Sequence, residues 1–249
     1  MARLVLAVVS LAFAAAALGA DARKYAVLSL LGDEMQVVTA TMATGQRLDR
    51  NPRSYVRLDD PVIDKTALLT ANETLKRLTG TDPVLLFARE RVLYAMQQRL
   101  MSEGRGMVNL LESIKPLVQD TGATHLVLFT KARREARMQL SDLALGTGMV
   151  EGVGFYVDPY TEVTLRDKQQ NATGFVAAFG YFDAALVDLS KGTILAEQRV
   201  TASRTTATSN AVATDVWTGI SGAQKMRMLQ DIIRTEVGRT IPELLKESN

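Results

Sequence analysis

The spacing of apolar residues changes along the chain, and each spacing predicts a different kind of element. The run KYAVLSLL (24–31) has the length of a strand and ends at Gly32 and Asp33. MQVVTATMAT (35–44) is rich in β-branched residues, and we expect it to pair back on the first run as a hairpin. A polar, turn-like segment then leads to SYVRL (54–58), a short third strand.

Helical spacing begins near Pro61 and predicts three helices before the middle of the chain. The first helix should end at Gly80, and two more should cover residues 88–103 and 107–118, with a kink or a late start at Pro116. In the first helix the apolar positions recur at steps of three and four, at Ala67, Leu68, Ala71, Leu75 and Leu78.

Two short apolar runs lie between and after these helices and predict buried strands. VLLFA (84–88) follows the first helix, and THLVLFT (124–130) follows the third after Gly122. An order of helix, glycine turn and apolar strand is typical of a crossover connection to a buried strand.

The second half of the chain predicts a long hairpin and a final helix. FVAAFGYFDAALVDLSKGTILAEQRVTAS (175–203) gives two long alternating strands around a turn at 190–193. Residues 201–214, rich in Ser, Thr and Ala, are expected to form a mobile loop. The amphipathic end should be one helix that restarts at a capping box, Thr240 to Glu243. Its apolar positions are Met226, Leu229, Ile233, Val237 and Ile241.

These elements predict an α/β (α+β) fold: a mixed β-sheet with helices packed on it, a long antiparallel hairpin in the second half and an amphipathic C-terminal helix. Residues 23–249 are enough to bury a core and are expected to form a single α/β domain. Two smaller packed domains, divided near residues 80–84, are the alternative.

Residues 1–22 have the three parts of a secretory signal peptide. Arg3 gives the positive start and residues 4–18 the apolar stretch, and cleavage is expected after Gly19 or after Ala22. The alternative is an amino-terminal membrane anchor, but about 20 apolar residues are needed to cross a bilayer. We therefore expect a periplasmic protein without a transmembrane segment after signal cleavage.

Composition narrows the function classes. The chain has no cysteine, which excludes disulfides and thiolate metal sites. The formal net charge is +2 and the charges are spread out, which does not indicate a nucleic-acid partner.

The run TGMVEGVG (147–154) has the glycine spacing of a dinucleotide-binding turn. Such a turn must follow a buried strand and open a helix. Here FYVDPYTEVTL follows, which predicts a β-segment interrupted by Pro159, and no tyrosine has a lysine four residues on. We therefore expect no cofactor, and glycines that bend the β-segment or let another backbone pass close.

The sequence contains no Gly-x-Ser-x-Gly nucleophile elbow, no His-Glu-x-x-His helix and no P-loop. The single histidine, His125, cannot form a multi-histidine metal site and is interpreted as structural. The adjacent pairs Asp33–Glu34 and Asp59–Asp60 are interpreted as solvated loop charges or helix-entry residues. We expect no metal site.

Two segments resemble a known group of proteins. The helix–glycine–strand unit LLESIKPLVQDTGATHLVLF and the strand–turn–strand unit ALVDLSKGTILAEQRVTAS resemble bacterial envelope proteins of the TolB amino-terminal and curli-secretion (CsgG-like) type, over about residues 84–202. The resemblance implies an α/β layer used for assembly and protein contact, without catalytic residues. This chain lacks their lipid-attachment cysteine and inserts a glycine- and aromatic-rich segment at 146–160.

These observations predict a non-enzymatic binding or assembly module for another envelope component, or one that self-associates. The outer strand of the long hairpin is a place where a partner strand could add. Phe155, Tyr156 and Tyr160 are the candidate partner-binding residues, with core packing as the alternative for these aromatics. The alternative function is a periplasmic hydrolase with an unmarked active site around His125.

Overall fold

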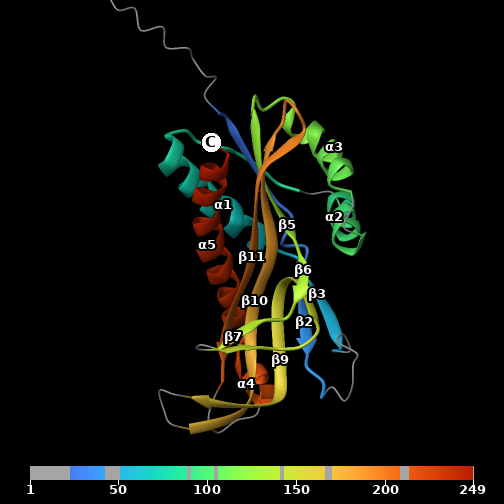
Figure 1. Ribbon diagram of the computed structural model, residues 1–249, viewed down its shortest axis with the longest axis vertical. Helices are drawn as coiled ribbons and strands as arrows, with labels where there is room; N and C mark the ends of the chain where they lie inside the picture. Colours follow the sequence, from blue (N-terminus) through green and yellow to red (C-terminus); the bar gives the residue numbers. More distant parts are fainter. Residues whose placement is uncertain are drawn as a thin grey trace, which may run out of the picture.

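A central mixed sheet carries helices on both of its faces. The computed structural model describes residues 23–42, 51–88, 91–103, 106–140, 143–165, 170–207 and 213–248. Figure 1 views the sheet nearly edge-on, with α1 (Val62–Thr79) and α5 (Gly222–Glu247) on one face and α2 (Arg91–Glu103) and α3 (Met107–Val118) on the other. The predicted fold class is confirmed.

The upper part of the sheet is parallel and is built around β1 (Tyr25–Ser29). β4 (Val84–Leu86) and β5 (His125–Lys131) flank β1, and both pair with it in parallel. The helices α1, α2 and α3 connect these strands, as the order of helix, glycine and strand predicted. β5 also pairs antiparallel with β10 (Gln170–Asp188), so the same strand joins the parallel and antiparallel parts.

The lower part of the sheet contains β2 (Glu34–Thr39), and here the predicted pairing is wrong. β2 does not fold back on β1; it pairs in parallel with β9 (Met149–Leu165) and antiparallel with β3 (Arg53–Arg57). β4 and β5 already occupy both edges of β1, so β1 has no edge left for β2. β9 in turn pairs antiparallel with β10.

Three short strands run between β5 and β9. β6 (Arg133–Glu135) pairs with β9, and β7 (Met138–Leu140) pairs with β8 (Leu143–Leu145) in a small separate sheet. β7 lies beside the lower end of β11 (Thr193–Thr206), where the Gln139 N–H donates to Ser203 Oγ at 2.7 Å and Thr205 Oγ1 donates to the Gln139 carbonyl at 2.7 Å.

The predicted long hairpin is present as β10 and β11. β11 continues to Thr206, because Val176 to Tyr181 of β10 supply paired neighbours for residues 201–206. The predicted loop over 201–214 is therefore wrong for residues 201–206, and also for residues 213 and 214, which are helical. Residues 208–212 lie outside the described residues, and α4 (Ala213–Gly219) follows them.

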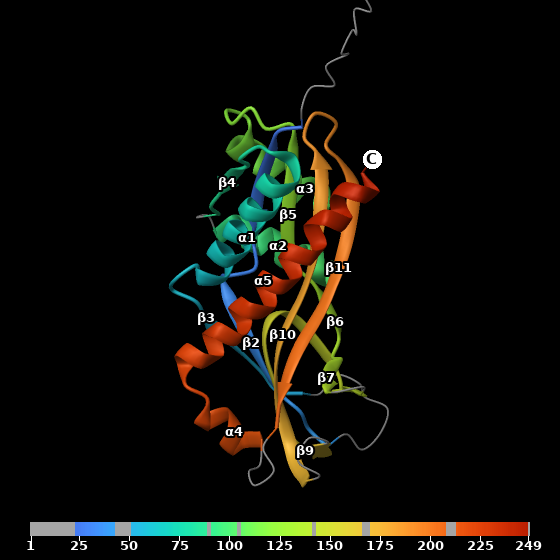
Figure 2. The same ribbon diagram turned by 90° about the vertical axis from the view of Figure 1, so that its left-hand side faces the viewer.

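The C-terminal helix α5 crosses the sheet face diagonally, beside α1 (Figure 2). Its capping box is at the start of the helix: Ser221 Oγ accepts from the Gln224 N–H, and the Gln224 side chain accepts from the Ser221 N–H. The predicted restart at Thr240–Glu243 is wrong, because the helix runs unbroken through Pro242. None of the helices in the described part of the chain is both long enough and apolar enough to cross a lipid bilayer.

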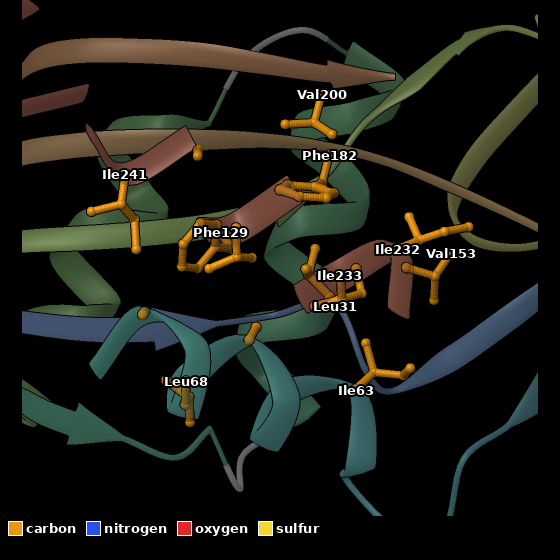
Figure 3. Packing of buried hydrophobic residues seen from close by; sticks show 14 of the residues in the cluster. Leu31, Ile63, Leu68, Phe129, Val153, Phe182, Val200, Ile232, Ile233 and Ile241 are labelled. Carbon is orange, nitrogen blue, oxygen red and sulfur yellow. The ribbon is translucent and has the colours of Figure 1, made fainter. Parts of the chain in front are cut away.

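The main core lies between the sheet and the pair α1 and α5. Figure 3 shows its centre, where Phe129 of β5 and Phe182 of β10 meet Ile233 of α5. The two phenylalanine rings meet edge to face, with centroids 6.1 Å apart. Leu229, Val237 and Ile241 of α5 are buried there as the spacing predicted. A second core under α2 and α3 and a third around β9 and the lower part of β10 cover the other face.

Candidate functional site

A pair of cavities opens where the parallel strands β1 and β4 end. In α/β sheets this carboxyl edge is the usual place for a ligand. The larger cavity has a volume of about 560 Å³ and the smaller about 280 Å³, and Pro61 and Ala88 line both. The larger one is also lined by polar side chains, namely those of Asp33, Glu34, Arg57, Asp59, Arg91, Tyr94 and Gln98.

Asp64 of α1 lines the smaller cavity, and two of its hydrogen-bond partners, Gly32 and Tyr94, line the larger one. Its Oδ1 accepts from Ser29 Oγ at 2.5 Å and from the backbone N–H groups of Leu31 and Gly32 at 2.8 and 3.2 Å. Its Oδ2 accepts from the Tyr94 hydroxyl at 2.9 Å. Burial raises the pKa of the Asp64 carboxyl although these donors favour its ionised form. Burial, with the neighbouring Asp64 charge, also raises the pKa of Tyr94.

A second polar group joins the end of β1 to β5. The Gln97 side chain of α2 donates to the Leu30 carbonyl at 2.8 Å and accepts from the Lys131 N–H at 2.8 Å. The Lys131 ammonium is buried and forms an ion pair with Asp33. Burial raises the pKa of the Glu34 carboxyl. The interpretation of Asp33 and Glu34 as solvated loop charges is therefore wrong, because both carboxyls lie against the end of the sheet.

Asp64 accepts four hydrogen bonds from groups of the protein itself, three at Oδ1 and one at Oδ2. Within the described ranges, no three His, Cys, Asp or Glu side chains are placed to share a metal ion. What the network does is fasten α1, α2 and the residues after β1 to one another.

The spacing of residues in α1 indicates that the Asp64 carboxylate is buried. Asp64 is three, four and seven residues before Ala67, Leu68 and Ala71, which puts a carboxylate on the apolar stripe of α1. A charged residue on such a stripe is buried with its partners. Tyr94 and Gln97 gave no comparable signal, since both are ordinary residues of an amphipathic helix.

Residues 149–154 of the glycine run form the start of β9, and no helix follows them. A Cβ on Gly154 would overlap the Gln36 carbonyl oxygen, so only glycine lets β2 pass this close. Gly152, at φ +63°, leaves room for the Lys131 side chain, whose Cδ would lie 2.7 Å from an added Cβ. The interpretation that a glycine of this run lets another backbone pass close is confirmed at Gly154.

The three candidate partner-binding residues lie in different surroundings. Phe155 and Tyr156 are 0% exposed. The Phe155 ring meets the Trp217 ring of α4 with centroids 5.2 Å apart, and the Tyr156 hydroxyl accepts from the Thr147 N–H at 2.9 Å. Tyr160 is 48% exposed. Of these three side chains, that of Tyr160 is accessible at the surface and those of Phe155 and Tyr156 are not.

His125 lies at the opposite end of β5 from the cavities. Its Nδ1 is 2.8 Å from Thr124 Oγ1, and its ring tilts against Tyr25 with centroids 5.8 Å apart. Asp188 lies opposite His125 in the β5–β10 ladder, but its Oδ1 accepts from the Ser190 hydroxyl and from the Ser190 and Lys191 N–H groups. Those hydrogen bonds lower the pKa of Asp188 to about 2. Asp188 thus closes the turn before β11.

The outer edge of β11, on the side away from β10, is the remaining candidate site. One hydrogen bond shows which of its residues direct their backbone N–H and C=O groups outward. The Tyr181 carbonyl in β10 accepts from the Ala132 N–H at 3.0 Å, so Tyr181 directs its backbone groups away from β11. Thr201 lies opposite Tyr181, and in an antiparallel ladder both members of such a pair point outward. Arg199 and Glu197 lie two and four residues before Thr201, and the pairing with β10 does not shift between them. They therefore also direct their N–H and C=O groups away from β10.

This edge is open over its upper part. Within the ranges given above, β10 is the strand that pairs with β11, and no backbone hydrogen bond reaches the outer edge between Leu195 and Thr201. In Figure 1 this part of β11 forms the edge of the sheet nearest the viewer. Glu197 and Arg199 are exposed. Although Arg199 lies opposite Asp183 in the ladder, the Asp183 carboxylate pairs with Arg134.

Comparison with known proteins identifies no family. No family model and no curated protein matches the chain. Among solved structures, the chain is similar to a dodecamer of a PelC point variant from Paraburkholderia phytofirmans, at 13% identity over 85% of each chain and a TM-score of 0.25. A TM-score this low does not establish a common fold, so neither the fold nor the assembly of that protein transfers to this chain. The resemblance to TolB amino-terminal and CsgG-like envelope proteins stays a prediction.

Proposed function

We propose that this chain is an exported, periplasmic protein of the bacterial envelope and acts as a non-enzymatic binding or assembly module. It binds another envelope component, or a second copy of itself, by adding a partner strand to the outer edge of β11. Export is supported by Arg3, the apolar residues 4–18 and the small-residue cleavage positions. Residues 1–22 lie outside the described residues.

The open edge of β11 is the observation that carries this proposal. Glu197, Arg199 and Thr201 each present an N–H and a C=O outward on a strand of 14 residues that contains no proline. Unpaired edges of this kind are templates for another strand, and proteins that stay monomeric usually cover or blunt them. In β11 the cover from β7 begins only at Ser203.

Tyr160 supplies a second, smaller contact in this proposal. It is half-exposed and follows Pro159 in β9. A tyrosine with an apolar ring and a free polar tip is favoured where a partner surface meets water. Phe155 and Tyr156 support this contact from the interior, by fixing β9 beneath it.

Thr201→Pro tests the proposal, because proline removes the outward N–H of residue 201 without removing a bond to β10. The matched control is Thr201→Val, which changes the side chain and keeps the N–H. Tagged wild-type protein and both variants are used to capture partners from the native envelope. A partner retained by wild type and by Thr201→Val, and lost with Thr201→Pro, is the expected result. Equal capture by all three proteins would contradict binding at this edge.

A further inference from the structure

The side chains on the open edge of β11 specify a partner strand of their own sequence. Glu197 and Arg199 project from the same face of β11, the face opposite α5, and each is exposed. Neither forms an ion pair within the part of the chain that the structure describes. A strand that places an arginine opposite Glu197 and a glutamate opposite Arg199 would satisfy both charges.

We propose that two copies of this chain associate through antiparallel pairing of their β11 edges, with a twofold axis at Gln198. This inference rests on the proposed function and names its partner as a second copy. In this register Glu197 of each copy lies opposite Arg199 of the other, and the ladder runs from Leu195 to Thr201. Beyond that point the side chain of Ser203 already accepts a hydrogen bond from β7.

The directions of the backbone N–H and C=O groups in β11 agree with this register. Glu197 and Arg199 direct their N–H and C=O groups outward, so the Glu197–Arg199 pairs exchange both backbone hydrogen bonds. Gln198 directs its backbone groups toward β10 and becomes the non-hydrogen-bonded pair on the axis, where the two strands come closest. Its side chain lies on the α5 face, where it donates to Glu247 Oε1 at 2.5 Å, and so leaves the opposite face to the charges.

The neighbouring registers are worse. A twofold axis perpendicular to the sheet leaves the α5 faces of both copies on the same side of the joined sheet. Such an axis must lie midway between the two copies of one residue. At Glu197 or at Arg199 it brings two like charges directly opposite each other, which is destabilising. At Ala196 or Val200 it places the two charges opposite uncharged residues. Of these five positions, the axis at Gln198 is the one that pairs opposite charges.

Charge exchange tests the contact in the whole protein. Light scattering should show a concentration-dependent dimer for wild type. Glu197→Arg and Arg199→Glu should each weaken it at least tenfold, since each places like charges opposite one another. The double variant Glu197→Arg/Arg199→Glu should recover most of the wild-type affinity. Thermal unfolding of the monomers confirms that all variants fold.

Cross-linking tests the register independently, because the chain contains no cysteine. Gln198→Cys places two sulfurs across the axis within disulfide reach and should form a covalent dimer on mild oxidation. Thr201→Cys is the control, since two Thr201 residues would lie about 20 Å apart along the ladder. A disulfide in Gln198→Cys alone is expected.

A wild type that stays monomeric, a double variant that fails to recover, or equal cross-linking at both positions would overturn the self-association. If the capture of an envelope partner nevertheless remains sensitive to Thr201→Pro, the proposed function stands and only the identity of the partner is wrong. If capture and self-association are both absent, the proposed function fails as well.

Discussion

The hydroxyl of Tyr94 donates to Asp64 Oδ2 at 2.9 Å, although the two residues belong to helices on opposite faces of the sheet. The bond passes over the carboxyl end of β1, where Oδ1 of the same carboxylate holds Leu31 and Gly32. One buried side chain therefore ties both helical layers to the sheet. β2 follows this end of β1 directly in the chain.

Asp64→Ala should destabilise the protein strongly. The substitution leaves the Ser29 hydroxyl, the Leu31 and Gly32 N–H groups and the Tyr94 hydroxyl without their acceptor, at a cost of about 3 kcal/mol or more. Asp64→Asn keeps an oxygen for the first three donors and should cost about 1 kcal/mol. Urea unfolding measures both values. Similar midpoints for the two variants would show that the carboxylate does not fasten this end of the sheet.

Proline substitutions should reveal which residues of β11 direct their N–H outward and which donate it to β10. Thr201→Pro removes an outward N–H and should leave the melting temperature close to that of wild type. Gln198→Pro removes a ladder bond to β10 and should lower it by several degrees or prevent folding. Thermal unfolding followed by circular dichroism separates the two. A larger fall in melting temperature with Thr201→Pro than with Gln198→Pro would mean that Thr201, and not Gln198, directs its N–H toward β10.

Substitutions of the aromatic residues of β9, made one at a time, should have different effects on stability. Tyr156→Ser removes a ring that is 0% exposed and stacked near Phe175, so we expect a loss of about 3–5 kcal/mol. Tyr160→Ser changes an exposed ring and should alter stability by about 0.5 kcal/mol or less. Chemical unfolding gives both numbers. If Tyr160→Ser reduces partner capture at normal stability, Tyr160 is a contact residue; unchanged capture would remove it from the proposed site.

His125 should give the protein a mild pH dependence. Burial, with the nearby positive charge of Arg23, lowers the pKa of His125 in the folded state. Between the folded and unfolded pKa values the unfolded chain binds the additional proton, so stability should fall as the pH drops below about 6.5 and level off above it. His125→Gln should flatten that dependence. Urea midpoints from pH 5 to pH 8 provide the test, and an identical slope in the variant would contradict it.

The sequence was a good guide to elements and a poor guide to their pairing. Period-two and period-three-to-four spacing placed the helices and the β10–β11 hairpin, because burial of one face imposes those periods locally. The partner of β2 could not be read in the same way. Its neighbour β9 lies more than a hundred residues away, and the close approach at Gly154 becomes visible only when the two backbones are side by side.

The candidate site shows the same limit. Asp64 was readable as a carboxylate on an apolar helical stripe, but its partners Tyr94 and Ser29 come from separate elements. The open edge of β11 was foreseen as the outer strand of the hairpin. Which of its N–H groups point outward depends on the bond between Ala132 and Tyr181, and that bond is a property of the folded sheet.

Photo-cross-linking in the native cell tests the central claim most directly. A photoreactive amino acid is placed at Arg199 on the outer edge of β11 or, as the control, at Arg234 on the exposed side of α5. Irradiation should give a discrete adduct from position 199 and none from position 234, and Thr201→Pro in the same chain should abolish it. An adduct of twice the chain mass identifies a second copy as the partner, and another mass identifies a different envelope protein. No adduct at position 199, or an adduct that survives Thr201→Pro, would contradict binding through the β11 edge.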